Sequence, residues 1–391
     1  MKKWRYFGIR LISCIFGFLQ NRMRLQHVNA KERLRGIFGK RWIGLWLALF
    51  TFLLTELLAA FPALTESVYS RGLYPSIAMA LSSVSRWFPF SLDDLFYVGL
   101  IVLGLVSILA LVLRRMRWHS FLVLWMNSLA GLYVLFYWLW GFNYYRQELN
   151  ERLTIAQSEP DTEVFIEVLS ELIESANAAY ISVDTLDVAR VDSLVEDSYQ
   201  QLAPFLKIDY PAGVRRAKPI TFSGFFAKAT ILGYYGPFFN EVQVSRYLLS
   251  VQYPLVLAHE KAHQLGITGE AEANFYAWLV CANSPDQVLQ YSASLYLLRY
   301  FLSEAYQLEA YPQLVKQISE PVKSDFQRIR EHWLMLRDVK IDEYASKMND
   351  AYLKTNKVEQ GIDDYSGVVK YVMDFSTDSV ANKRLRKLLN P

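Results

Sequence analysis

Cysteine, histidine and charged residues are all scarce in this sequence. Of its 391 residues, 2 are cysteines, 5 are histidines and 20% are charged. Two cysteines are too few for a disulfide framework or for a zinc ribbon of four thiolates. A hydrophobic fraction of 53% makes the chain too apolar for an intrinsically disordered protein, and its low charge content excludes a coiled coil.

The small net charge of +3 conceals two unlike parts of the chain. Residues 1–142 contain 16 Lys and Arg against 5 Asp and Glu, whereas residues 143–391 contain 25 against 33. A basic first third followed by an acidic remainder predicts a membrane module joined to a soluble domain. The acidic remainder also argues against a nucleic-acid partner, since binding to phosphates needs a basic face.

Three long apolar runs lie in the basic first third, at Trp42–Phe61, Phe96–Leu113 and Ser120–Phe142. Each run is long enough to cross a hydrocarbon layer of about 30 Å as a helix. The single acid of the first run, Glu56, lies near one end of that run, and its side chain is expected to reach the membrane interface. We therefore predict a membrane domain over residues 42–142, with three transmembrane helices in the lipid bilayer.

The basic residues that flank these runs predict the orientation of the helices. Residues 1–41 hold eleven Lys and Arg, and Arg114, Arg115 and Arg117 lie in the short loop between the second and third runs. The positive-inside rule places both segments in the cytoplasm. We therefore expect a multi-pass protein of the cell membrane, with a basic cytoplasmic segment at 1–41 and an extracytoplasmic domain at 143–391.

The second part of the chain is predicted to be an α+β domain, mostly helical with a small sheet. Apolar residues at helical spacing indicate helices over Asp161–Tyr180 and Asp187–Leu206. Strands are expected over Lys218–Ser223 and Phe238–Ser245, the second because polar and apolar residues alternate along it. Later helices are expected over 251–265, 269–283, 286–306, 323–345 and 362–374.

Two of the five histidines stand four residues apart, in the string His-Glu-Lys-Ala-His at 259–263. On a helix this spacing puts His259 and His263 on one face, one turn apart, where both imidazoles can bind a single Zn²⁺. Glu260 is then placed to take a proton from the activated water molecule. Gly266 is suited to end this helix. The competing interpretations are a solvated helix face and a metal site without catalysis.

A catalytic zinc site needs a third protein ligand and one open position. The helix that begins near Gly269 offers Glu270, which is the predicted third ligand because two histidines and a carboxylate form a known catalytic set. Glu272 is the alternative, and it points about 200° away from Glu270 on an ideal helix, so that the two are not expected to share one metal. Asn274 is placed to hydrogen-bond the far nitrogen of a ligand histidine.

The string His-Glu-Lys-Ala-His-Gln-Leu-Gly at 259–266, followed by Glu-Ala-Glu-Ala-Asn-Phe at 270–275, resembles the zincin metallopeptidases of the two-His-one-Glu type. With Phe-Asn-Tyr-Tyr-Arg at 142–146, Gly-Pro-Phe-Phe-Asn-Glu at 236–241 and Tyr365, the chain more closely resembles a bacterial membrane-protein family catalogued as domain of unknown function 3810. The likeness extends over most of the chain. It implies a zincin-like domain in a membrane-anchored zinc peptidase without an assigned substrate.

The leading hypothesis is a membrane-anchored, zinc-dependent metallopeptidase that hydrolyses peptide bonds of a peptide or protein substrate. His259, His263 and Glu270 would be its metal ligands, and Glu260 its base. The alternative is a non-catalytic, zinc-binding membrane sensor or assembly factor, which a closed fourth coordination position would favour. An intramembrane protease is disfavoured, because the apolar run before His259 is too short to span a bilayer.

The sequence does not decide two further features of a peptidase site, the donor to a tetrahedral intermediate and the sheet edge for the substrate. Tyr365, Tyr276 and His332 are each candidates for the donor that stabilises a tetrahedral intermediate. The strand over Phe238–Ser245 is a candidate sheet edge for an extended substrate, because it precedes the histidine helix and has one polar face. An ordinary strand within the sheet fits the same pattern equally well.

Overall fold

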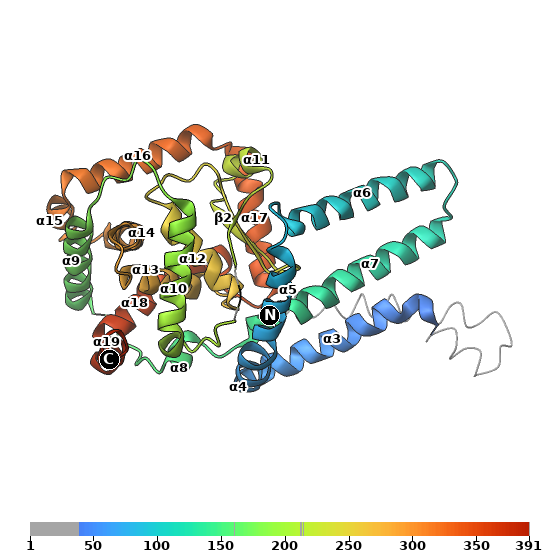
Figure 1. Ribbon diagram of the computed structural model, residues 1–391, viewed down its shortest axis with the longest axis horizontal. Helices are drawn as coiled ribbons and strands as arrows, with labels where there is room; N and C mark the ends of the chain where they lie inside the picture. Colours follow the sequence, from blue (N-terminus) through green and yellow to red (C-terminus); the bar gives the residue numbers. More distant parts are fainter. Residues whose placement is uncertain (1–38, 160, 212, 214, 391) are drawn as a thin grey trace.

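The computed structural model describes residues 39–390 apart from 160, 212 and 214. Three long helices extend from one side of a larger domain (Figure 1). They are α3 (Ile43–Ala60), α6 (Leu92–Val112) and α7 (Trp118–Leu139), and each is long and apolar enough to cross a membrane. The three predicted apolar helices are thus confirmed. The predicted basic segment 1–41 lies almost entirely outside the described residues.

The side chains of these three helices are largely exposed, which is compatible with insertion into lipid. Helix α6 meets α7 near the loop that joins them, where the Trp125 indole donates a hydrogen bond of 3.0 Å to the Ser107 hydroxyl. At the other end of the helices, Glu56 of α3 forms an exposed ion pair of 3.1 Å with Lys357 of the larger domain. The Glu56 carboxylate therefore reaches the junction between the long helices and the domain, in agreement with an interfacial position.

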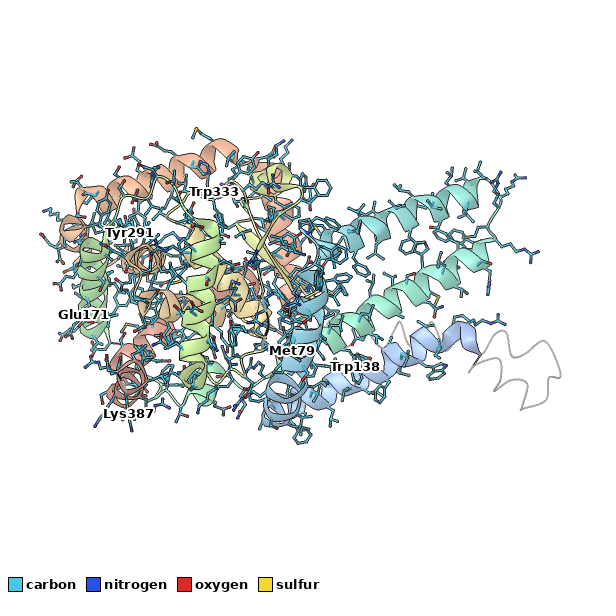
Figure 2. The ribbon with its side chains drawn as sticks, viewed as in Figure 1. Met79, Trp138, Glu171, Tyr291, Trp333 and Lys387 are labelled. Atoms are coloured by element: carbon cyan, nitrogen blue, oxygen red, sulfur yellow. The ribbon has the colours of Figure 1, made fainter. Side chains whose placement is uncertain are left out.

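The segment between α3 and α6 folds back onto the larger domain. It consists of α4 (Pro62–Leu64), the π-helix η2 (Thr65–Leu73) and α5 (Tyr74–Ser85). The residues buried on α5 are spaced by about one helical turn, so that they form a single face. Ser85, at the end of this face, donates a hydrogen bond of 2.7 Å to Glu241 in the sheet. Figure 2 shows Met79 of α5 and Trp138 of α7 at this junction.

The larger domain is mostly helical and contains one small sheet, as predicted. Its elements before the histidine string are η3 (Gly141–Tyr145), α8 (Leu149–Leu153), α9 (Thr162–Ala179), α10 (Val188–Leu206), β1 (Lys218–Pro219), α11 (Ser223–Lys228), β2 (Gly233–Gly236) and β3 (Glu241–Val244). The elements that follow are α12 (Tyr253–Gln264), α13 (Glu270–Ala282), α14 (Gln287–Ala305), α15 (Tyr311–Gln317), α16 (Glu320–Leu336), α17 (Val339–Thr355), η4 (Gly361–Gly367), α18 (Val368–Thr377) and α19 (Ser379–Leu389).

The sheet differs from the prediction in three respects. Its strand order is β1-β3-β2, with β1 parallel and β2 antiparallel to β3. The strand predicted over Phe238–Ser245 is therefore central rather than an edge, and all four residues of β3 are buried. Strand β2 was not predicted, because its Gly-Tyr-Tyr-Gly sequence is more typical of a loop. The strand predicted over Lys218–Ser223 is confined to two residues.

The predicted helix over 323–345 is wrong, because the chain breaks there into α16 and α17. Asp338 lies in the break, and its carboxylate accepts hydrogen bonds from the backbone N–H groups of Lys340 and Ile341 at 3.0 and 3.2 Å. An aspartate in this position starts a new helix by satisfying its first free donors. The helices predicted over Asp161–Tyr180 and Asp187–Leu206 are confirmed as α9 and α10, each with its aspartate as the N-cap.

A buried ion pair ties the folded-back segment to the turn after α12. Arg146 donates to both carboxylate oxygens of Glu66 at 2.8 Å, and its third hydrogen bond, of 2.9 Å, goes to the carbonyl of Gly266. The two side chains are only 3% and 10% exposed. Loss of the carboxylate would leave a buried guanidinium without its counter-charge, which is far more costly than loss of an exposed pair.

Replacing Glu66 with alanine is therefore expected to lower the free energy of unfolding by about 3–5 kcal/mol. The matched control is Glu56→Ala, which removes the exposed pair with Lys357 and is expected to cost no more than about 1 kcal/mol. Denaturation of the purified full-length protein in detergent measures both. Equal losses in the two variants would contradict the assignment of Glu66 as a buried structural partner.

Candidate metal centre

Helix α12 carries both histidines through the interior of the larger domain. Each of its residues from Pro254 to Gln264 is buried, so that the whole histidine string is enclosed. The helix ends where Gly266 adopts a φ of +86°, a left-handed conformation that favours glycine. A Cβ at this position would lie 2.9 Å from the Tyr74 ring, so the turn also has no room for a side chain. This tight turn directs the chain back towards the histidines.

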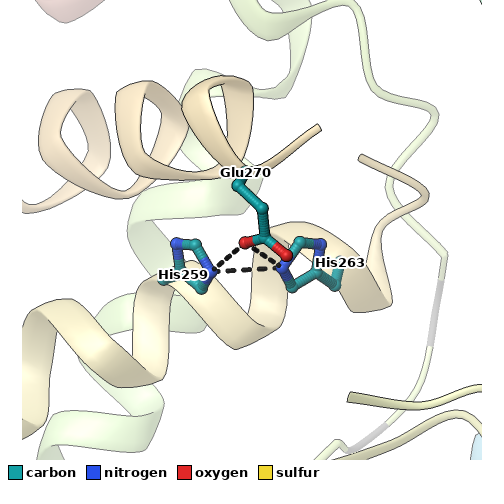
Figure 3. Close-up of side chains that lie close together, drawn as sticks. All are labelled: His259, His263 and Glu270. Carbon is teal, nitrogen blue, oxygen red and sulfur yellow. Dashed lines mark hydrogen bonds and ion pairs between the residues drawn. The ribbon is translucent and has the colours of Figure 1, made fainter. Parts of the chain in front are cut away.

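The turn brings Glu270, the first residue of α13, next to the two imidazoles (Figure 3). One carboxylate oxygen of Glu270 lies 3.1 Å from Nε2 of His259 and 3.4 Å from Nε2 of His263. The two Nε2 atoms are 3.1 Å apart. Among the described residues, these three form the one group of His, Cys, Asp or Glu side chains arranged closely enough to hold a metal ion.

The hydrogen bonds at the far side of each ring determine the tautomer. Nδ1 of His263 lies 2.7 Å from the carbonyl oxygen of Ile267, which can only accept, so Nδ1 carries the hydrogen. Nδ1 of His259 lies 2.8 Å from the side-chain oxygen of Asn274. The amide nitrogen of Asn274 donates to the carbonyl of Tyr365 at 3.2 Å, which orients its oxygen towards His259. Both Nδ1 atoms are therefore donors.

In the neutral form of each ring, the Nε2 atom then carries a lone pair, and the two lone pairs converge with an anionic carboxylate. Such an arrangement is repulsive unless a cation or a proton lies among the three atoms. Ligands at 2.0–2.1 Å from a tetrahedral ion are separated by roughly 3.3–3.4 Å, close to the 3.1, 3.1 and 3.4 Å found here. The donor set and its spacing thus fit Zn²⁺.

Glu260 lies beside this cluster and against the sheet. Burial raises the pKa of Glu260 to about 7, although positive charge on the neighbouring His259 and His263 opposes the rise. A Cβ at Gly233 of β2 would lie 2.8 Å from a carboxylate oxygen of Glu260, so only glycine lets the strand approach this closely. The predicted base therefore lies between the cluster and an edge strand.

The two candidate carboxylates on α13 have different partners. Glu272 forms an ion pair of 2.8 Å with the buried Arg152, whereas Glu270 joins the histidines. The start of the helix is held by Asp364 of η4, whose carboxylate accepts from the backbone N–H groups of Glu270 and Ala271 at 2.8 and 3.2 Å. The predicted contact between Asn274 and one of the two histidines is confirmed by its hydrogen bond to His259.

The three candidate donors to a reacting carbonyl differ in their position relative to the cluster. The ring of Tyr365 is nearly parallel to that of His259, with centroids 6.3 Å apart. Tyr276 instead donates its hydroxyl hydrogen to the carbonyl of Leu206 at 2.8 Å. His332 lies on α16, where Nε2 is 2.7 Å from the carbonyl of Tyr247. Only Tyr365 is therefore placed beside the cluster.

Several residues that position the cluster were missed by sequence reasoning. The Trp140 indole donates to the carbonyl of His263 at 2.9 Å, and the Tyr74 hydroxyl donates to the carbonyl of Gln264 at 2.7 Å. Both bonds satisfy free carbonyls at the end of α12. Lys261 is buried and pairs with Asp192 and Glu196 of α10 at 2.7 and 2.6 Å. The sequence contained one signal for this pairing. It is the presence of a lysine inside the histidine string, on a helix whose first half is apolar.

The chain belongs to the family described as "Protein of unknown function (DUF3810)", whose model matches residues 69–373. The resemblance to this family is thereby confirmed. The matched range contains α6, α7 and every residue of the cluster. No curated protein and no solved structure matches the chain. Because the family description assigns no activity, the chemistry has to be argued from the arrangement of the side chains.

If Glu270 rather than Glu272 is the third ligand, Glu270→Gln should lower the zinc affinity of the full-length protein by more than the roughly 10- to 100-fold typical of losing a group that only orients a ligand. Glu272→Gln should keep about one Zn²⁺ per chain, because its partner is Arg152. Metal analysis after dialysis against a graded chelator series measures both variants, and circular dichroism confirms that they are folded. The assignment fails if Glu272→Gln loses the metal and Glu270→Gln retains it.

The zinc affinity is also expected to depend on pH. Burial alone would lower the pKa of His263, but the charge and hydrogen bond of Glu270 outweigh it and raise this pKa to about 9 in the metal-free protein. Below that pH a proton occupies Nε2, and a metal has to displace it. Zinc affinity should thus fall by up to about tenfold per pH unit as the pH drops from about 9 towards neutrality.

Chelator competition at a series of pH values measures this dependence. The same proton stabilises the metal-free fold. Its contribution to the free energy of unfolding is present in full below the ordinary histidine pKa of 6.5, and it is lost as the pH rises to about 9. A zinc affinity that stays constant between about pH 7 and 9 would contradict protonation of His263 in the metal-free protein.

Proposed function

We propose that this protein is a membrane-anchored, zinc-dependent metallopeptidase. The observation that carries the proposal is the convergence of three buried donor atoms, from His259, His263 and Glu270, at the spacing of a tetrahedral zinc site. Two histidines and one carboxylate leave a fourth position for chemistry. When bound, zinc would supply a Lewis acid that activates a water molecule and polarises a substrate carbonyl.

In this proposal Glu260 is the general base. It follows His259 on α12, so that its carboxylate lies beside the ligands without replacing either of them. It would take a proton from the attacking water molecule and pass it to the amine that leaves when the peptide bond breaks. The pKa of about 7 that burial gives this carboxyl suits a group that accepts and then returns a proton near neutral pH.

A peptide substrate is supported by the position of β2. This strand is at the edge of the sheet, and within the described residues its outer side pairs with no other strand. An extended peptide can add to such an edge through backbone hydrogen bonds. Because Gly233 of β2 lies against Glu260, a peptide bound there would pass next to the base. The zincin resemblance of the histidine string supports the same substrate class.

The location outside the cytoplasm is part of the proposal. It rests on the excess of Lys and Arg in residues 1–41 and in the loop between α6 and α7. The alternative, a zinc-binding sensor or assembly factor without catalysis, would be favoured by a fourth protein ligand. Among the described residues, the cluster contains three, which favours a catalytic site over a closed structural one.

The decisive comparison is between the wild-type protein and Glu260→Gln, both purified at full length with zinc. Glu260→Gln should retain the metal and cleave a proteome-derived peptide library about 10²–10⁴ times more slowly, since the base is lost but the ligands are intact. Glu171→Gln on α9, far from the cluster, is the matched control and should retain full activity. Unchanged cleavage by Glu260→Gln would exclude Glu260 as the base. Zinc binding without cleavage by the wild type would favour the non-catalytic alternative.

A further inference from the structure

Helix α17 carries an apolar stripe, most of which nothing in the described part of the chain covers. Tyr344 and Met348 are 70% and 74% exposed, and Tyr352, one turn further, is 41% exposed. Residues four apart lie on one face of a helix. The core-facing side of α17 is a different one and carries the buried Asp342 and Leu353. A helix on the surface of a soluble domain normally buries its apolar stripe, so this one requires an apolar partner.

A row of lysines borders this stripe. Lys340, Lys347 and Lys354 follow one another at seven-residue intervals, which is about two turns, and all three side chains are exposed. Lys354 also pairs with Asp350 on the same helix at 2.8 Å. An apolar stripe bordered by lysines is typical of helices that lie in the plane of a membrane surface and contact anionic headgroups.

The end of α17 is fixed at the level where the long helices meet the domain. Lys357, just after the helix, pairs with Glu56 in the last two turns of α3. Asn356 accepts a hydrogen bond of 3.1 Å from the hydroxyl of Tyr137, near the end of α7. Tyr352 itself packs edge-on against Phe136, with ring centroids 6.2 Å apart. In Figure 1, α17 runs across the direction of α6 and α7, on the side of the domain that carries them.

We infer that α17 is an interfacial helix whose apolar stripe is immersed in the headgroup region of the bilayer that the long helices enter. Its occupant is thus a lipid surface containing anionic headgroups. The stripe meets the end of α7 where Tyr352 packs against Phe136, a helix that the lipid would surround, and its lysine row provides the complementary charge. The lipid contact does not depend on the proposed peptidase activity.

The position of α17 also relates the cluster to the membrane. The Tyr144 hydroxyl donates to that of Tyr352 at 3.1 Å, and Tyr144 packs edge-on against Trp140, with centroids 5.4 Å apart. Trp140 in turn packs against His263 at 6.4 Å. A continuous aromatic contact therefore runs from the stripe to the histidines. If the proposed function holds, substrate would approach along the membrane surface, as a juxtamembrane or lipid-anchored segment does.

The test measures the depth of α17 with spin labels on the full-length protein in lipid nanodiscs. A label at Met348→Cys, in a Cys14→Ser background in which Cys281 is buried, reports on the stripe. Glu343→Cys, exposed on another face of the same helix, is the matched control. Glu171→Cys on α9, at the end of the domain away from the long helices (Figure 2), reports on the aqueous side.

In nanodiscs of phosphatidylcholine with phosphatidylglycerol, the ratio of oxygen to nickel-chelate accessibility should be several-fold higher at 348 than at 343 and 171. Replacing the three lysines with glutamine, or omitting phosphatidylglycerol, should reduce this difference. Equal accessibility at 348, 343 and 171 would overturn the inference. Strong dipolar coupling between labels at 348 on two copies would also overturn it, by showing a second chain on the stripe. Neither readout requires zinc or cleavage.

Discussion

Two imidazole nitrogens face each other 3.1 Å apart, each with its hydrogen held on the opposite side of its ring. While both rings are neutral, the carbonyl of Ile267 and the amide oxygen of Asn274 prevent either ring from turning a donor towards the other. With Glu270 added, three electron-rich atoms meet in a buried space, which is unfavourable without a positive charge between them. The turn at Gly266, the start of α13 and the contacts from η4 all serve to maintain this convergence.

The segments next to the long helices help to hold the cluster in place. Trp140 and Tyr74 satisfy carbonyls at the end of α12, and Arg146 joins Glu66 to the turn that follows. Side chains that precede α6 in the sequence and side chains that follow α7 thus hold the same turn at the end of α12. The geometry of the cluster is consequently linked to the segments that flank the long helices, and a fragment beginning after α7 would lose the contacts made by Tyr74 and Glu66.

Two irregular parts of the backbone shape the surroundings of Glu260 and of α17. Strand β2 consists of two glycines and two tyrosines, yet its first glycine allows the sheet edge to lie against Glu260. The break at Asp338 turns the chain from α16 into α17, the helix that carries the exposed apolar stripe and whose end contacts α3 and α7. The first feature depends on the missing side chain of Gly233, and the second depends on the N-cap at Asp338.

The sequence alone determined the three apolar helices, the helices at α9 and α10, the facing pair His259 and His263, and the contact of Asn274. All follow from hydropathy or helical spacing, which are local properties of the chain. Tertiary structure decided which carboxylate lies beside the histidines: Arg152, more than a hundred positions earlier, engages Glu272, and Glu270 is left next to the two rings. It also placed β3 in the centre of the sheet, since strand order depends on which distant segments supply backbone partners, and no local pattern encodes those partners.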